Sequence, residues 1–168
     1  MSQYPDIAVG DLVTADLLAS MLPAFVRKAA DEAAPTSSAA VQDDDELFLD
    51  VVANASYFVD AWLRHTAVSN TPDIRLNYSY PAGASFARSD WGAPDTTTTS
   101  ADTINNTIST TTDNTRGSNT VERAIYMRGE LIVGSTAGTF KVRFGQATSS
   151  VDAVTMKAGS RLILTRYA

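Results

Sequence analysis

The sequence predicts an all-β fold, an antiparallel β-sandwich of the jelly-roll type with about eight strands. Several short segments alternate apolar and polar residues, which is typical of strands with one buried face. Turn-forming Gly, Pro, Asn and Ser residues separate these segments. No helices alternate with the strands, as a parallel α/β sheet would require. Strands this short and numerous favour a jelly roll over a meander.

The 168 residues have room for one domain and an appendage. We expect an N-terminal extended arm and short helix over residues 1–26, followed by a β-sandwich domain over 27–168. Within that domain, residues 82–120 are expected to form a long, variable loop region. The absence of cysteine excludes disulfides and thiolate metal sites.

The arm begins with an extended stretch, residues 1–13, and Thr14 is a candidate N-cap for a helix from Ala15 to about Val26. Pro23 lies inside that span and either kinks the helix or ends it near Leu22. An apolar stripe at helical spacing consists of Leu17, Leu18, Met21, Leu22 and Phe25. The stripe can dock on the chain's own sheet or on a partner, and the pattern favours neither.

An edge strand or a linker is expected over residues 27–40, followed by four adjacent acids at Asp43–Glu46. The acids resemble a cation site but lack the alternating ligands and the glycine of a calcium loop. We therefore interpret them as an acidic turn before a strand at Leu47–Val52. Further strands are expected at Ser56–Thr66, whose two faces are both partly apolar, and at Asp73–Tyr80.

The middle of the chain is read as a long connection. Phe86 and Trp91 stand among Gly, Pro and Ser, and eleven of the 26 residues from Asp95 to Thr120 are threonine. Threonine favours extended backbone, so one or two short strands with loops are expected there; a wholly disordered insert is the alternative.

The clearest strand signal runs from Arg123 to Ala147. Two alternating arms flank a glycine-containing turn at residues 134–138, which predicts an antiparallel hairpin with one face in the core. The expected inward residues are Ile125, Met127, Leu131, Val133, Phe140, Val142 and Phe144. Strands at Val151–Met156 and Arg161–Tyr167 close the chain.

Composition and motifs exclude several functions. The net charge of −6 disfavours nucleic-acid binding, no apolar run reaches the roughly 18 residues of a membrane span, and no secretory signal is expected. The single histidine, His65, is interpreted as structural, and no nucleophile elbow or phosphate-binding loop is present. We expect no enzymatic activity, cofactor or metal.

Charge is unevenly distributed along the chain. Residues 1–50 carry ten acids and two bases, whereas residues 121–168 carry three acids and seven bases. The asymmetry reflects solvated surface charge, or else an acidic end of one subunit that meets the basic end of another.

Three segments, in the same order, resemble small virion surface proteins of tailed bacteriophages of actinobacteria. They read GDLVTADLLASMLPAFVRKAADEA, VQDDDELFLDVVANASYFVDAWL and RGELIVGSTAGTFKVRFGQATSSVDAVTMKAGSRLILTR. The resemblance covers about three quarters of the chain and omits Ala82–Thr120. It implies a tumour-necrosis-factor-like jelly roll, a homotrimer, and a place in the virion on the capsid surface or the tail.

These observations lead to two functional hypotheses. In the first, the chain is a head decoration protein whose stripe residues dock on the capsid, while Tyr57, Trp62, Tyr126 and Tyr167 supply the subunit interface; an ordinary core is the alternative for those four. In the second, it is a tail fibre or tail-tip protein that binds a host glycan or protein, with Phe86 and Trp91 as candidate receptor contacts. For a third class, a glycan-cleaving enzyme, no carboxylate pair stands out.

Overall fold

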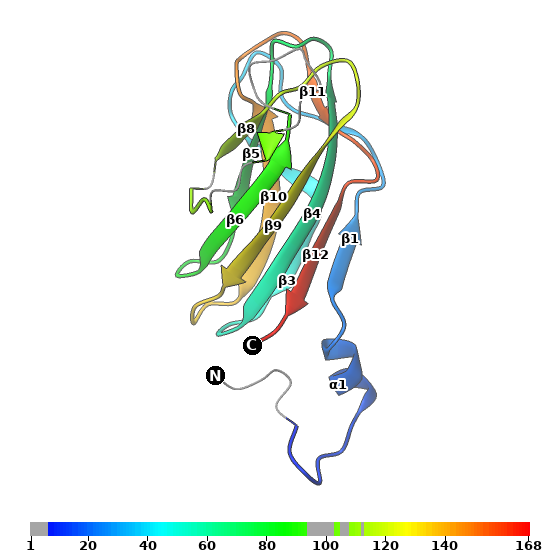
Figure 1. Ribbon diagram of the computed structural model, residues 1–168, viewed down its shortest axis with the longest axis vertical. Coiled ribbons are helices and arrows are strands. Elements are labelled where there is room, and N and C mark those ends of the chain that lie inside the picture. Colours follow the sequence, from blue (N-terminus) through cyan, green and yellow to red (C-terminus); the bar gives the residue numbers. More distant parts are fainter. Residues whose placement is uncertain (1–6, 94–102, 105–107, 112) are drawn as a thin grey trace.

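A computed structural model describes residues 7–93, 103–104, 108–111 and 113–168, and shows a sandwich of two antiparallel sheets (Figure 1). Its elements are α1 (Ala15–Ser20), β1 (Ala24–Arg27), β2 (Glu32–Ala33), β3 (Gln42–Val51), β4 (Ser56–Ala67), β5 (Ile74–Ser79), β6 (Ser85–Gly92), β7 (Thr103–Ile104), β8 (Asn114–Arg116), β9 (Arg123–Ile132), β10 (Gly138–Gln146), β11 (Val154–Met156) and β12 (Arg161–Arg166). No helix in these described residues is long and apolar enough to span a bilayer.

The strand order is that of a jelly roll. In the larger sheet the order is β1-β12-β4-β9-β6-β7, with β11 beside β4 and β2 beside β11; in the smaller sheet it is β3-β10-β5-β8. Four nested antiparallel pairs result, β1 with β12, β3 with β10, β4 with β9 and β5 with β8. This nesting is what a single long hairpin gives when it rolls into a sandwich. The predicted all-β sandwich is confirmed.

The core lies between the sheets and is filled by the inward residues of each strand. Every inward residue expected from the 123–147 alternation is buried. The hairpin itself is wrong, because β9 pairs with β4 and β6 in the larger sheet, whereas β10 pairs with β3 and β5 in the smaller one. The glycine-containing turn therefore crosses from one sheet to the other.

The predicted connection around Phe86 is also wrong, because β6 is an eight-residue strand paired with β9. Its inward positions include Arg88 and Asp90, so its sequence lacks an apolar alternation. The Arg88 guanidinium lies 4.7 Å above the Tyr78 ring, and its Nε donates to Asp90 Oδ2 at 3.1 Å. Burial, the first cause, together with the Asp90 charge raises the pKa of Tyr78.

Two further expectations at the start of the chain need correction. Asp43–Glu46 does not form a turn but the first half of β3. The helix ends at Ser20, and Ala24–Arg27 pairs with β12 as an edge strand that crosses the expected boundary at residue 26. Pro23 accounts for the break, because it has no backbone N–H to donate within a helix.

Candidate docking leader and outer sheet face

The leader, defined here as residues 7–22, extends away from the sandwich. It joins the body through β1, the edge strand of the larger sheet, and α1 lies beyond the end of the sandwich, beside neither sheet (Figure 1). The Leu17 N–H donates to Thr14 Oγ1 at 3.1 Å, so Thr14 caps the helix as expected. A six-residue helix is too short to be stable by itself in water.

Apolar side chains of the leader and of β1 face solvent. The exposed fractions are 54% for Leu18, 71% for Leu22 and 55% for Phe25, and Met21 is similarly exposed. Leu17 is half-buried. Further along the leader Val9, Leu12 and Val13 are exposed as well. The predicted stripe is therefore available to another molecule in the described structure.

A second accessible surface is the outer face, defined as the outward side chains of β1, β12, β4, β9 and β6. One register row across these five strands consists of Arg27, Arg161, Trp62, Tyr126 and Trp91. The Arg161 guanidinium lies 4.7 Å from the centre of the Trp62 ring, and the Trp91 and Tyr126 rings lie 5.3 Å apart. Aromatic and cationic groups thus cross the sheet in one continuous line.

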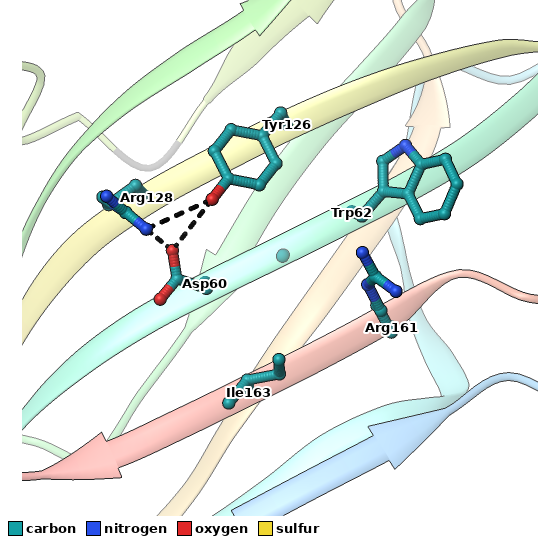
Figure 2. Close-up of a pocket in the computed structure, with 7 residues that line it drawn as sticks. Asp60, Trp62, Tyr126, Arg128, Arg161 and Ile163 are labelled. Atoms are coloured by element: carbon teal, nitrogen blue, oxygen red, sulfur yellow. Dashed lines mark hydrogen bonds and ion pairs between the residues drawn. The ribbon is translucent and has the colours of Figure 1, made fainter. Parts of the chain in front are cut away.

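A shallow hollow of about 240 Å³ lies in the middle of the outer face, between Trp62, Arg161 and Ile163 on one side and Asp60, Arg128 and Tyr126 on the other (Figure 2). Asp60 Oδ1 accepts hydrogen bonds from Arg128 Nε at 2.7 Å and from the Tyr126 hydroxyl at 3.3 Å. The hydrogen bond and charge of Asp60 raise the pKa of Arg128. Aromatic area and paired charges of this kind suit contact with another protein or a polar ligand.

The structure brings together three of the four expected interface residues. Trp62, Tyr126 and Tyr167 lie on the outer face, where Tyr167 stacks on Phe58 with ring centres 4.4 Å apart. Burial, followed by the hydrogen bond that its hydroxyl donates to Glu130, raises the pKa of Tyr167. The fourth residue, Tyr57, is a core residue whose hydroxyl accepts from the Val52 N–H at 3.0 Å, so its ordinary-core alternative holds.

The two candidate receptor contacts separate. Phe86 is only 3% exposed and packs edge-on against Tyr78 and Phe140, so it contributes to the core and not to a receptor surface. Trp91 is half-buried on the outer face beside Tyr126, not in a loop tip.

His65 is a core residue. Its Nε2 lies 3.2 Å from the Gly117 carbonyl oxygen, and its Nδ1 has no partner within the described residues. Burial lowers the pKa of His65 to about 4, so the ring is neutral at pH 7. An isolated neutral imidazole with one backbone partner is a structural feature, as the sequence indicated.

Sequence reasoning did not single out Asp60, Arg128, Arg161, Ile163 or Phe58 for the outer face. The signal was present in part, because Phe58, Asp60 and Trp62 share one parity along β4. Which residues of β9 and β12 join them depends on the strand order, which the sequence does not determine.

No protein-family model matches the chain, and no curated protein matches it. Among solved structures it is similar to "Structure of infectious bursal disease virus Gt strain", at 10% identity and a TM-score of 0.21, over 87% of this chain and 41% of that chain. It is also similar to "Structure of infectious bursal disease virus Gx strain", at 6% identity and a TM-score of 0.21, over 86% and 40%. The chain spans about 40% of those chains' length. Similarity at this level carries no argument for this protein.

Proposed function

We propose that the chain is a non-enzymatic structural protein of a phage virion, a homotrimeric head decoration protein that its leader anchors to the capsid. The observation that carries the proposal is the solvent-exposed apolar leader, which extends beyond the sandwich. Apolar side chains gain about 25 cal/mol for each Å² that they remove from water. A segment too short to fold alone gains order by burying such side chains on a partner.

The sequence resemblance supports a virion partner. It includes the leader itself, in the segment GDLVTADLLASMLPAFVRKAADEA, and the closing strands of the sandwich. The leader is thus one of the segments shared with small virion surface proteins, and it is also the most exposed apolar part of the described chain.

Self-association is proposed to use the outer face. Phe58, Trp62 and Tyr126 are between about 40% and half exposed there, although such large rings are ordinarily buried. Arg161 has no carboxylate partner among the described residues, so it is free to pair with an acid of another copy. Size-exclusion chromatography with light scattering tests this: a trimer supports it, and a monomer at micromolar concentration contradicts it.

Attachment to particles tests the docking role. Deleting residues 1–22 leaves β1 in place, so we expect the sandwich to remain folded by circular dichroism while co-sedimentation with purified particles is lost. The matched control is Val151→Ser, which removes an apolar side chain that is 80% exposed outside the leader. Attachment of the truncated protein at the wild-type level would discard the docking role.

A tail fibre or tail-tip protein that binds a host glycan is the second candidate. The observation that favours it is the aromatic row of the outer face, because sugar rings stack on exposed Trp and Tyr side chains. A trimer that covers the outer face would leave this row inaccessible, so the two candidates exclude one another. Electron microscopy of particles with labelled protein separates a head from a tail location.

A further inference from the structure

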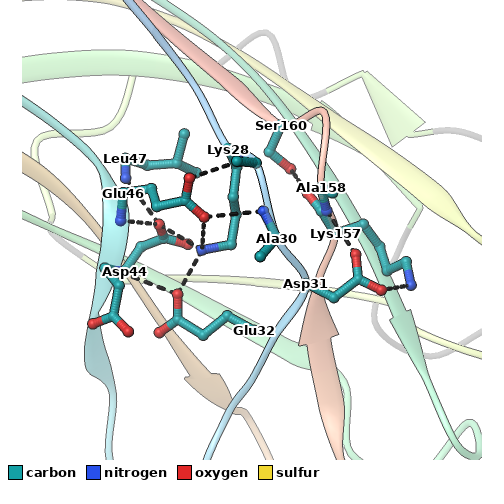
Figure 3. Close-up of polar contacts among 12 residues, drawn as sticks. Lys28, Ala30, Asp31, Glu32, Asp44, Glu46, Leu47, Lys157, Ala158 and Ser160 are labelled. Atoms are coloured by element: carbon teal, nitrogen blue, oxygen red, sulfur yellow. Dashed lines mark hydrogen bonds and ion pairs between the residues drawn. The ribbon is translucent and has the colours of Figure 1, made fainter.

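A buried lysine lies at the point where the leader enters the sandwich. Lys28 follows β1 directly, and its side chain is only 1% exposed. Asp44 of β3 and Glu32 of β2 surround its amine, and Glu46 of β3 lies slightly further away (Figure 3). These groups come from three different strands and gather at one edge of the sandwich.

The contacts are unusually close for a buried pair. Lys28 Nζ donates to Glu32 Oε2 at 2.6 Å and to Asp44 Oδ1 at 2.9 Å, whereas Glu46 Oε1 lies 3.8 Å away. The Asp44 side chain is fully buried. A full hydrogen-bond shell for a buried carboxylate would engage both oxygens, and that is not the case here.

The two oxygens of Asp44 have different surroundings. Oδ1 accepts backbone N–H hydrogen bonds from Glu46 at 3.0 Å and from Leu47 at 2.8 Å, in addition to the Lys28 amine. Oδ2 is buried and has no hydrogen-bond partner in the described part of the chain. Two N–H groups aimed at one oxygen are the arrangement that stabilises an oxyanion during acyl transfer. The other oxygen is unrestrained and can leave.

The geometry points to a self-catalysed isopeptide bond between Lys28 Nζ and Asp44 Cγ, with Glu32 as the proton-transferring residue. Glu32 is the acid in direct contact with the amine, as a general base must be. Nothing in the sequence brings these residues together, because Lys28 and Asp44 are 16 positions apart.

The starting pair is ionic. Burial lowers the pKa of Lys28, but the hydrogen bonds and charges of Glu32 and Asp44 outweigh it, with a net rise. The ammonium therefore first passes one proton, through Glu32, to Asp44 Oδ2. A neutral amine then lies beside a neutral carboxylic acid, a pair that a buried site accommodates without the cost of two desolvated charges.

The bond-forming step follows from that neutral pair. The Nζ lone pair attacks Cγ, and the carbonyl electron pair moves to Oδ1, where the N–H groups of Glu46 and Leu47 hold the charge. Glu32 removes a proton from Nζ and delivers it to the Oδ2 hydroxyl. The Cγ–Oδ2 bond breaks and water leaves. An ammonium and a carboxylate have become an amide and one water, with no oxidant, reductant or cofactor.

The position of the bond gives it a mechanical meaning. β1 has four residues and is held by backbone hydrogen bonds to β12 alone. A covalent link from Lys28 to β3 joins the leader-bearing segment to the smaller sheet. Asp31 adds a second attachment, because it accepts hydrogen bonds from the Lys157 ammonium and, at 2.8 Å, from the Ala158 N–H (Figure 3). Force on the leader would then be borne by the whole sandwich.

Intact-mass spectrometry of the denatured full chain tests the inference. The wild-type protein is expected to be lighter than its sequence by the mass of one water. Trypsin is expected to leave Lys28 uncut and to release a branched peptide that contains Asp44. A wild-type mass equal to the sequence, with linear peptides only, would overturn the inference.

Glu32→Gln and its matched control Glu46→Gln test the proton transfer. Both remove one carboxylate near Lys28, but only Glu32 contacts the amine closely. We expect Glu32→Gln to slow bond formation by about 10²–10⁴-fold and Glu46→Gln to retain the bond. Circular dichroism checks that both variants fold. Wild-type rates in Glu32→Gln would refute the role given to Glu32, and none of these readouts depends on particle attachment.

Discussion

The most quantitative prediction concerns the stability that the Lys28–Asp44 cross-link contributes. The bond closes a loop between residues 16 positions apart. A loop of about 15 residues removes chain entropy from the unfolded state equivalent to about 3 kcal/mol. In a protein of this size, about 3 kcal/mol corresponds to about 6–12 °C in the melting temperature. We therefore expect Glu32→Gln to unfold at least that much earlier than the wild type.

Thermal unfolding followed by circular dichroism, with the cross-link content measured by mass on the same samples, is the assay. Glu46→Gln again serves as control, because it removes a more exposed acid from the same cluster. Its melting temperature is expected to lie within about 2 °C of the wild type, as for most exposed substitutions. Equal melting temperatures for both variants, with the cross-link absent from one, would refute the reasoning.

Three further predictions concern the core and the outer face. Because burial lowers the pKa of His65 to about 4 from 6.5, the folded state binds the proton less readily than the unfolded state. Stability is complete above pH 6.5 and declines below it, by about 2 kcal/mol at pH 5; urea unfolding should show a smaller decline in His65→Gln. A Cβ at Gly129 would lie 2.6 Å from the Phe86 ring, so Gly129→Ala should cost about 1–3 kcal/mol in urea unfolding; unchanged stability would contradict this packing. Trp62→Ser should leave the fold intact and weaken self-association in light scattering, and an unchanged oligomer would remove Trp62 from the interface.

How far the sequence predicts the structure depends on whether apolar alternation is visible. The Arg123–Ala147 alternation correctly predicts which residues are buried, because each strand has one apolar face. It does not reveal that the intervening turn crosses between sheets, since alternation is the same whichever neighbour a strand pairs with.

β6 shows the opposite case. Two of its inward positions, Arg88 and Asp90, are charged and satisfy each other inside the core. Without an apolar alternation the strand reads as a loop, and Phe86 was therefore assigned to a receptor surface.

The candidate site was predictable only in part. The apolar stripe of the leader is visible in sequence because its spacing is local. The outer face is not, because Trp62, Tyr126 and Arg161 meet only through the pairing of β4 with β9 and β12. The same holds for Lys28 and Asp44, whose contact requires the two sheets to close at one edge.

The central claim is that the leader docks on another virion protein, and quantitative binding to particles that lack this protein tests it most directly. Leu22→Ser removes a side chain that is 71% exposed in the described structure. Burying a leucine stabilises a contact by about 1.5–3 kcal/mol, so affinity should fall at least about tenfold while the unfolding free energy changes by less than about 0.5 kcal/mol. Unchanged affinity together with a clear loss of folding stability would contradict the account, because it would mean that the leader packs on its own sandwich.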